Sequence, residues 1–587
     1  MVIPILVGVF AGVVGVGCFA LVHLVLNFPA IHEQLNHFWY LAPPLIGAVA
    51  AVLHSLAGWR QRRNTAPLKK DNLTDILESY FFGVFRIAPM RWVARGVVSV
   101  LNALIGGIFG IEGGILELCF STLPFFSRFA RFFIEERQTF VVCALSSSLG
   151  VALGAPFSGI LITLELLHVL EARVRGSAVL AALVAYGTAT FLQSIVPSTF
   201  FIDGNRASSN IISYLFSGLE PLHLEAKNWL FMSLAAVVVG LGGGALSSFS
   251  SRMFVKAAEA YQQLTRKRAW VSFLVTGVSM GVLVWLVPEA YTEPHRLWYD
   301  LAWLKLSSLT AFVILIAHWS LLLLAFSGWG SSGLFTSALV LGSLFGYSLG
   351  GAIAGLFDLQ SALLPLTISG AVSVLCGLFA VPVAASALVL EVGRDPQVWC
   401  IATIAVIAAR AMTFFLGTRP LHEILASRRG VRIVGGRVAS LLGKLKTMDA
   451  MYTDFVTISD DASLFDLRDA VVRSRHNFIG VLSMDEKFLG LLALERMPSQ
   501  IRRVLNADAT SQQIQALERV VEIRDLVDSF TPTVSLSESL EKALEILQES
   551  PCVPVVDEDR RLCGLLFESS IVGRYKHEVA SIAISDR

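Results

Sequence analysis

The sequence predicts an all-α polytopic membrane domain that is followed by a smaller α/β domain. Of the 587 residues, 55% are hydrophobic and only 16% are charged, whereas soluble domains carry about 25% charged residues. Apolar segments recur from residue 2 to residue 425, and beyond them short β-rich runs alternate with amphipathic helical runs. We therefore expect a membrane domain over 1–428, a linker over 429–447 and an α/β domain over 448–587.

The membrane domain is predicted from apolar segments that approach the roughly 20 residues a spanning helix needs. The first segment follows Met1 without a basic region, so we interpret it as a membrane helix and not as a signal peptide. Short or glycine-rich runs predict partial helices, which persist in a membrane only where protein buries them or where they line a cavity. The predicted segments are 2–27, 39–58, 92–109, 137–154, 157–171, 177–195, 227–247, 270–288, 308–325, 366–380 and 397–417, and the partial helices are 111–120, 331–346 and 383–392.

Clusters of basic residues predict how the chain is oriented. They lie at 60–63 (RQRR), 264–268 (LTRKR) and 428–432 (RRGVR). Because loops rich in Lys and Arg face the cytoplasm, we expect these clusters and the C-terminal domain on the cytoplasmic side. The sequence thus predicts a multi-pass protein of an inner or plasma membrane.

Several function classes are disfavoured by composition and by missing motifs. The net charge of +1 argues against a nucleic-acid partner. The seven cysteines are scattered, with neither metal-ligand spacing nor a disulfide framework. The chain has no nucleophile–base pair, no glycine loop with a phosphate-binding Lys and no HExxH motif, so we expect no enzyme, no cofactor and no metal site.

The membrane domain contains an internal repeat. The segment APFSGILITLEL (155–166) aligns with VPVAASALVLEV (381–392), and the alignment pairs Pro156 with Pro382 and Glu165 with Glu391. Many transport proteins are built from such repeats and bind their substrate between them. Sequence alone leaves open whether these repeats are parallel or inverted.

One carboxylate, Glu112, lies in a glycine-rich interruption of this apolar region. It follows Gly110 and precedes a new helical run, GGILELCFSTLPFF, so we expect it at a helix N-terminus. Such an end presents free N–H groups and a partial positive charge, and it therefore suits an anion. A carboxylate there is itself an anion, and an external anion can take its place once it is protonated or moved. The alternative is a structural helix cap, although acids inside membranes usually have a function.

The C-terminal domain also repeats itself. TISDDASLFDLRDAV (457–471) matches TVSLSESLEKALEIL (533–547), and FLGLLALE (488–495) matches LCGLLFES (562–569). We therefore expect two copies of one α/β unit.

These motifs, in their order and spacing, resemble the CLC family of chloride channels and chloride/proton antiporters, including bacterial-type members with paired CBS domains. GIEGG resembles the family's GREGP-type loop, whose Glu is the gate, and FSGWGSSGLFTS (326–337) resembles its GxFxP loop. The resemblance implies a homodimer of inverted repeats with broken helices and one pathway per subunit for chloride or a related small anion. It also implies gating by Glu112 and an anion site formed by Gly110, Ile111, Gly113, Gly333, Leu334 and Phe335.

The chain departs from the family pattern at several of these positions. Where most members have a serine loop, this chain has Asp71 and Asn72, and the asparagine resembles the loop of the fluoride-exporting branch. Ser337 replaces the proline of the GxFxP loop, and His422 replaces the tyrosine that lines the inner end of the pathway. An imidazole N–H donates to an anion as a phenol does, so we expect His422 to be an anion ligand or, alternatively, a structural histidine at the membrane edge.

Leu166 is the departure with the largest consequence. The family's chloride/proton exchangers usually carry an inner glutamate there, and leucine cannot carry a proton. The sequence therefore favours a passive anion channel that external protons gate through Glu112. The alternatives are a proton-coupled chloride or fluoride antiporter and a non-conducting membrane sensor, against which the intact gate loop argues.

The C-terminal repeats resemble paired CBS domains, which often bind adenine nucleotides. The ribose-contacting pattern of that family is Gly-apolar-apolar-Thr-x-x-Asp, whereas this chain reads GLLALER (490–496) and GLLFESS (564–570). Because both copies lack the Thr and the Asp, we favour a tail that supports a dimer over a nucleotide sensor.

Overall fold

The structure of the protein is a computed structural model. The chain divides into two compact units, Met1–Ala426 and Ser427–Arg587. The residues that the structure describes are 2–26, 39–59, 76–77, 80, 89–104, 108–122, 137–168, 172–195, 213–216, 226–264, 269–291, 294–303, 306–328, 333–357, 360–428, 445–474, 477–494, 497, 501, 521–528, 531–547 and 550–585.

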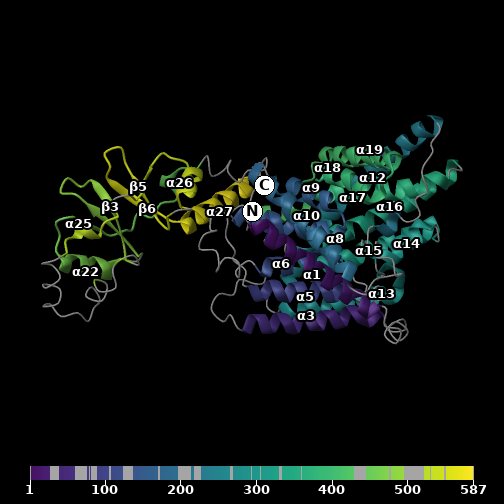
Figure 1. Cartoon of the computed structure of the whole chain (residues 1–587), viewed down its shortest axis with the longest axis horizontal. Helices are drawn as coiled ribbons and strands as arrows, with labels where there is room; N and C mark the ends of the chain where they lie inside the picture. The colour runs from purple at the N-terminus through teal and green to yellow at the C-terminus, as the bar shows by residue number, and fades with distance from the viewer. Residues whose placement is uncertain are drawn as a thin grey trace. The chain divides into compact units, whose positions relative to one another are not determined.

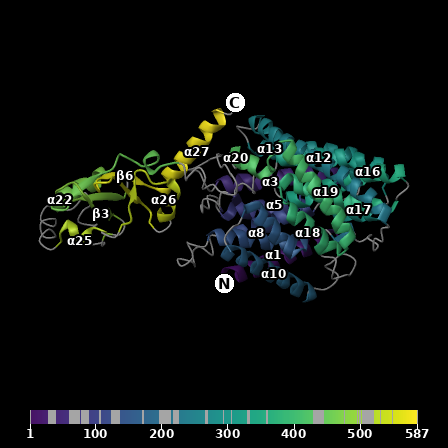
Figure 2. The ribbon, with the colours of Figure 1, turned by 90° about the horizontal axis from the view of Figure 1, so that it is seen from above.

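The described residues of the first unit form helices joined by short non-helical segments and no strand, which confirms the predicted fold class (Figure 1 and Figure 2). Six of the helices are long and apolar enough to cross a membrane, and several shorter apolar helices lie between them. In order, the elements are α1 (Val2–Leu26), η1 (Trp39–Leu41), α3 (Ala42–Trp59), α5 (Pro89–Leu104), α6 (Glu112–Ser121), α8 (Arg137–Leu153), α9 (Pro156–Leu167), α10 (Ala172–Ile195), α11 (Ser213–Phe216), α12 (Ala226–Leu264), α13 (Ala269–Leu286), η6 (Pro288–Tyr291), α14 (Pro294–Ala302), α15 (Ser308–Gly328), α16 (Leu334–Phe357), η7 (Gln360–Ala362), α17 (Leu363–Phe379), α18 (Pro382–Gly393), α19 (Pro396–Phe415) and α20 (Leu421–Arg428).

Two of the predicted helix lengths are wrong. The run at 331–346, predicted to be a partial helix, belongs to the 24-residue α16. The glycines of α16 do not interrupt the helix, and they allow α17 to pack closely against it. A Cβ on Gly346 would lie only 2.9 Å from the Cα of Gly370. Conversely, the segment predicted at 157–171 is the 12-residue α9, which is about 18 Å long and too short to span a bilayer.

Each of the two repeat helices, α9 and α18, caps the N-terminus of the other with a glutamate near its own C-terminus, a reciprocal contact that we call the clasp. The Glu165 carboxylate, near the end of α9, accepts hydrogen bonds from the N–H groups of Val383 (3.0 Å) and Ala384 (2.9 Å) at the start of α18. The Glu391 carboxylate, near the end of α18, accepts bonds from the N–H groups of Phe157 (3.0 Å) and Ser158 (2.8 Å) at the start of α9.

This reciprocal contact settles how the two helices run. Each helix places its C-terminal part against the N-terminus of the other, so α9 and α18 are antiparallel neighbours. An antiparallel pair of repeat elements is what inverted repeats produce. Both carboxylates satisfy N–H groups that a helix start leaves unpaired, and both favour the positive end of a helix dipole.

The clasp predicts an order of stability. Glu391 also accepts a bond from the Ser158 hydroxyl at 2.6 Å, and so has three donors where Glu165 has two. We expect Glu391→Ala to lower the free energy of unfolding by about 1–3 kcal/mol and Glu165→Ala by less. Thermal unfolding of the detergent-solubilised full chain measures both, and equal midpoints for wild type and Glu391→Ala would exclude the clasp as a stabilising contact.

The second unit confirms the predicted α/β repeat. Its two sheets have the orders β1-β2-β3 and β4-β5-β6, each with one parallel and one antiparallel pair. A register shift falls at Val481/Leu482 in one copy and at Val555/Val556 in the other. The elements are η8 (Thr447–Asp449), β1 (Thr457–Ser459), α22 (Leu464–Arg473), β2 (Phe478–Leu482), β3 (Phe488–Ala493), α25 (Ile523–Leu526), β4 (Val534–Ser535), α26 (Leu540–Leu547), β5 (Val553–Val556), β6 (Leu562–Leu566) and α27 (Glu568–Ser585).

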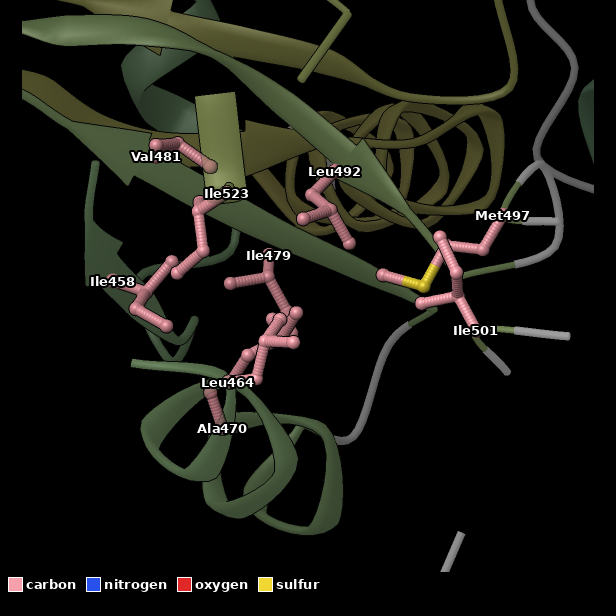
Figure 3. Packing of buried hydrophobic residues seen from close by; sticks show 10 residues of the cluster. Ile458, Leu464, Ala470, Ile479, Val481, Leu492, Met497, Ile501 and Ile523 are labelled. Carbon is pink, nitrogen blue, oxygen red and sulfur yellow. The ribbon is translucent and has the colours of Figure 1, made fainter. Parts of the chain in front are cut away.

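The segment that precedes each repeat contacts the other repeat. The core of the first repeat contains Ile458, Ile479 and Leu492 from its sheet, and Ile523 of α25 packs into the same cluster (Figure 3). In exchange Leu445 accepts a hydrogen bond from Leu540, although sequence places residue 445 in the linker. The segment before each repeat therefore contacts the other repeat, through side-chain packing at Ile523 and through a backbone hydrogen bond at Leu445.

Candidate functional site

Glu112 is the first residue of α6, so the predicted helix start is confirmed. Its side chain is only 2% exposed and reaches a different helix. One carboxylate oxygen, Oε1, accepts the backbone N–H of Thr336 at 2.7 Å, and Oε2 accepts the Thr336 hydroxyl at 2.8 Å. Thr336 is the third residue of α16, where an N–H group has no partner within its own helix.

Two helix N-termini therefore belong to this site, those of α6 and α16. The free N–H groups and the dipole of such an end favour negative charge. In this structure the negative group at α16 is the protein's own carboxylate, and it is held by two donors inside a buried environment. The same donors suit a small external anion when the carboxylate is elsewhere.

The glycine-rich loops before α6 and α16, which contain Gly110 and Gly333, contact and cross each other beside the Glu112 carboxylate. The Gly110 N–H donates to the Gly333 carbonyl at 3.0 Å. Gly333 has a left-handed backbone (φ +68°), and a Cβ there would overlap the carbonyl oxygen of Gly110. A Cβ on Gly110 would overlap the Glu112 carboxylate. Only glycine fits at position 333, because backbone occupies the space, whereas a side chain at position 110 would have to displace the Glu112 carboxylate.

Ser337, which stands where the family has proline, ties the same crossing together. Its hydroxyl lies 2.6 Å from the Ile108 carbonyl and 3.1 Å from the Gly333 carbonyl. The departure from the family pattern therefore adds a link between the two loops.

The structure brings together the predicted residues of both loops. Glu112, Gly110 and Gly333 are in contact as described, and the others are buried at the starts of α6 and α16. Those others are Ile111, Gly113, Leu334 and Phe335. The predicted ligands Asp71 and Asn72 lie outside the described residues.

Thr336 was not among the residues predicted from sequence, although it holds the carboxylate through two groups. The available signal was its place as the third residue of a helix that begins after Gly333. A Thr near a helix start presents an N–H and a hydroxyl on one side. What sequence could not provide is the contact itself, which joins positions 224 residues apart.

His422 lies at the start of α20 and is 1% exposed. It lines a cavity whose wall also contains Phe379. The Phe379 ring stacks on Phe335 with a centroid distance of 4.4 Å. Because Phe335 directly precedes Thr336, one pair of stacked rings lies between this cavity and the residue that holds Glu112.

Leu166 is 1% exposed on α9, next to the Glu165 that caps α18. No proton can be held at this position, because leucine has no ionisable group. Another acid of the same region, Glu117, is fully buried on α6, five residues after Glu112.

The C-terminal unit has a cavity of about 170 Å³ lined in part by Phe478, Asp528 and Thr531. Sites for drug-sized ligands are about 300–1,000 Å³, so this cavity is small for a nucleotide. The Thr531 hydroxyl already donates a hydrogen bond to the Asp528 carbonyl at 2.7 Å.

Because both copies lack the Thr and the Asp of the ribose-contacting pattern, we expect no micromolar binding of ATP, ADP or AMP. Calorimetry on the full-length protein measures this directly, with each nucleotide titrated into protein and into buffer. Saturable heat at micromolar nucleotide would contradict the expectation.

Comparison with known proteins identifies what this chain is similar to. The family model described as "Voltage gated chloride channel" matches residues 56–413, and the model described as "CBS domain" matches residues 523–577. The "H(+)/Cl(-) exchange transporter ClcA" of Salmonella agona (strain SL483) is 24% identical over 435 residues, which cover 72% of this chain and 87% of that protein.

Solved structures with the same fold include "Crystal Structure of a eukaryotic CLC transporter" (TM-score 0.66, 14% identity, 97% of this chain and 99% of that one). A slow cyanobacterial Cl-/H+ antiporter has a TM-score of 0.59 at 16% identity and covers 73% of this chain and 97% of its own. A CLC-type fluoride/proton antiporter has a TM-score of 0.53 at 17% identity, with 70% and 94% covered.

Proposed function

Because the chain belongs to the voltage gated chloride channel family and carries a CBS domain, we propose that it exchanges small anions for protons across a membrane, with chloride as the main anion. The observation that carries the proposal is the pair of hydrogen bonds from Thr336 to the Glu112 carboxylate. The name of the Salmonella relative, an H(+)/Cl(-) exchange transporter, supports exchange.

The mechanism follows from competition for one place. The ionised Glu112 side chain and an anion cannot both accept the Thr336 N–H and hydroxyl, so an anion enters only when the carboxylate leaves. A carboxylate that has left its donors is easier to protonate, because hydrogen bonds to the charged form favour that form. Anion binding at α16 therefore promotes proton binding at Glu112, and by reciprocity a proton promotes anion binding.

A passive anion channel gated by Glu112 is the second candidate, and Leu166 favours it. Sequence favours the channel, because the usual inner acid is missing from this position. The names of the relative and of the two antiporters support exchange instead. In a channel a proton bound at Glu112 would open the pathway without crossing the membrane.

The two candidates differ in the reversal potential under a proton gradient. Full-length protein in liposomes is given a chloride gradient, and the pH of one side is then lowered. Exchange predicts that the reversal potential moves away from the chloride equilibrium potential by a fixed fraction of the proton potential. A reversal potential that stays at chloride equilibrium at every pH would exclude exchange and establish the channel, and repeating the measurement with fluoride determines which anion is preferred.

A further inference from the structure

Exchange needs a group that can take up and release a proton on the cavity side of the stacked rings of Phe335 and Phe379. Leu166 cannot do this, because it has no ionisable group. The cavity itself has a volume of about 320 Å³, and His168 lines it together with His422. Because the His168 side chain is exposed, solvent reaches the cavity wall at this residue.

His168 is held in place by the end of α9. It terminates the helix in the left-handed region, with φ 50°, a conformation that His, Asn and Asp adopt more often than most residues. Its ring forms a hydrogen bond with the backbone of Leu166. A neutral imidazole has one N–H and one acceptor nitrogen, so the nitrogen that does not donate to this backbone is the one that takes up a proton.

A second imidazole connects His168 with the interior of the cavity. His422 is 1% exposed, and neither of its ring nitrogens has a hydrogen-bond partner among the residues that the structure describes. Buried polar atoms are normally hydrogen-bonded, to water if not to protein. A water molecule takes about 30 Å³ of liquid, so the cavity has room for several. The two rings are also close enough for the charge of His168 to act on His422.

The two imidazoles differ in burial and therefore in role. A charge is costly to bury, so the exposed ring of His168 is the one that can hold the proton. The buried ring of His422 can relay it, because a ring bonded to water at both nitrogens accepts a proton at one and releases a proton at the other.

Other charged groups lie on the elements that line the cavity or pack against the end of α9. The arginines among them keep their protons at physiological pH, and the carboxylate of α9 is bound to the start of α18. Only an imidazole ordinarily titrates between pH 5 and 8, which favours His168 over the half-buried carboxylate of α20. These groups are Glu165 of α9, Arg175 near the start of α10, Arg410 of α19, Arg419 between α19 and α20, and Glu423 of α20, whereas α17 has no charged residue.

We propose that His168 takes up and releases the exchanged protons on the cavity side, a role that rests on the exchange function proposed above. In one direction the proton leaves the His168 ring, passes along the cavity waters and the His422 ring, and ends on a carboxylate oxygen of Glu112 that has left Thr336. His168 loses its positive charge and Glu112 its negative charge, so the charges balance. Coupling is then compatible with leucine at position 166.

The number of protons moved per chloride tests this role in the full-length protein. Liposomes are given a chloride gradient, and both ions are recorded with electrodes. We expect His168→Asn to lower this ratio about tenfold or more, because it removes the titratable group while Asn still adopts the left-handed backbone.

Arg394→Asn is the matched control for this variant. Arg394 ends α18 with the same backbone, φ 54°, and follows His168 by the 226 positions that separate Glu391 from Glu165. It does not belong to the cavity wall that the structure describes. Its ratio of protons to chloride should equal that of the wild type.

His168→Asp separates a proton-carrying role from a structural one. Aspartate also adopts the left-handed backbone and binds a proton, so it should restore the coupling that His168→Asn loses. An ordinary Asp titrates about 2 to 3 pH units below an ordinary His. The pH at which coupling is half-maximal should therefore move down by about that amount in a series of pH values set equal on the two sides. If His168→Asn does not elute as one species in gel filtration, this shift decides.

Glu423→Gln is measured beside these variants, because Glu423 is the other group of the wall that can exchange a proton. A wild-type ratio in His168→Asn, an equal loss in Arg394→Asn, or unshifted or absent coupling in His168→Asp would overturn the role of His168 while exchange stands. Loss of coupling in Glu423→Gln alone would assign the role to that carboxylate. A wild type that moves no protons against their gradient would instead remove exchange itself, and the role of His168 with it.

Discussion

Glu112→Gln is expected to abolish proton coupling while anion flux continues. Glutamine has nearly the volume of glutamate, and its amide oxygen still accepts the Thr336 N–H. It has no charge and no titratable proton, so it cannot compete as an anion or carry a proton into the pathway. Chloride-driven proton movement should fall to the level of protein-free liposomes, and the chloride flux should lose its dependence on pH.

The matched control for this variant is Glu289→Gln, which removes an exposed carboxylate from the short helix η6. It should leave coupling and pH dependence as in the wild type. If Glu112→Gln still moves protons against their gradient when chloride flows, another group carries the proton and the proposed role of Glu112 is wrong.

Gly333→Ala is expected to reduce chloride flux on the order of 30-fold. An L-residue in the left-handed region costs about 1 kcal/mol, and the added Cβ would overlap the Gly110 carbonyl and lie 2.9 Å from the Gly110 nitrogen. No rotamer relieves a clash with backbone, so the hydrogen bond from Gly110 to Gly333 is lost, at about 1 kcal/mol more. The sum of about 2 kcal/mol corresponds to that factor if the strain falls on the anion site.

Gly355→Ala, in the helix α16 that begins directly after Gly333, provides the control. A Cβ at Gly355 meets nothing within 4 Å, and alanine is favourable inside a helix. Both variants are compared at equal amounts of protein that elutes as one species in gel filtration. Wild-type flux from Gly333→Ala would show that the crossing of the two loops does not shape the pathway.

Sequence predicted the parts of this site that depend on local pattern. The helix start at Glu112 follows from one acid between glycines, whereas the partial helix predicted from residue 331 begins at Leu334. The contact between them does not follow, since Thr336 meets Glu112 across 224 residues of chain. The clasp of Glu165 and Glu391 also joins distant parts of the chain, so sequence could not predict it, although the repeat itself was detected in the sequence.

Helix length was the weaker part of the sequence-based prediction. Glycines in α16 suggested a break, yet they serve close packing against α17, a use that the sequence pattern does not distinguish from a break. The cavity at His422 could not be predicted from sequence either, because its wall is formed by residues of four helices that lie up to 255 positions apart. A histidine in place of a tyrosine indicated a ligand but not the two arginines beside it.

The central claim is that the Glu112 carboxylate occupies the place of an anion at the start of α16. The most direct measurement locates bromide by anomalous scattering in crystals of the wild type and of Glu112→Ala. We predict that Glu112→Ala holds a bromide within hydrogen-bonding reach of the Thr336 N–H and hydroxyl, where the wild type has its carboxylate. Bromide absent from that place in Glu112→Ala, or present there in the wild type with the carboxylate still bound to Thr336, would contradict the claim.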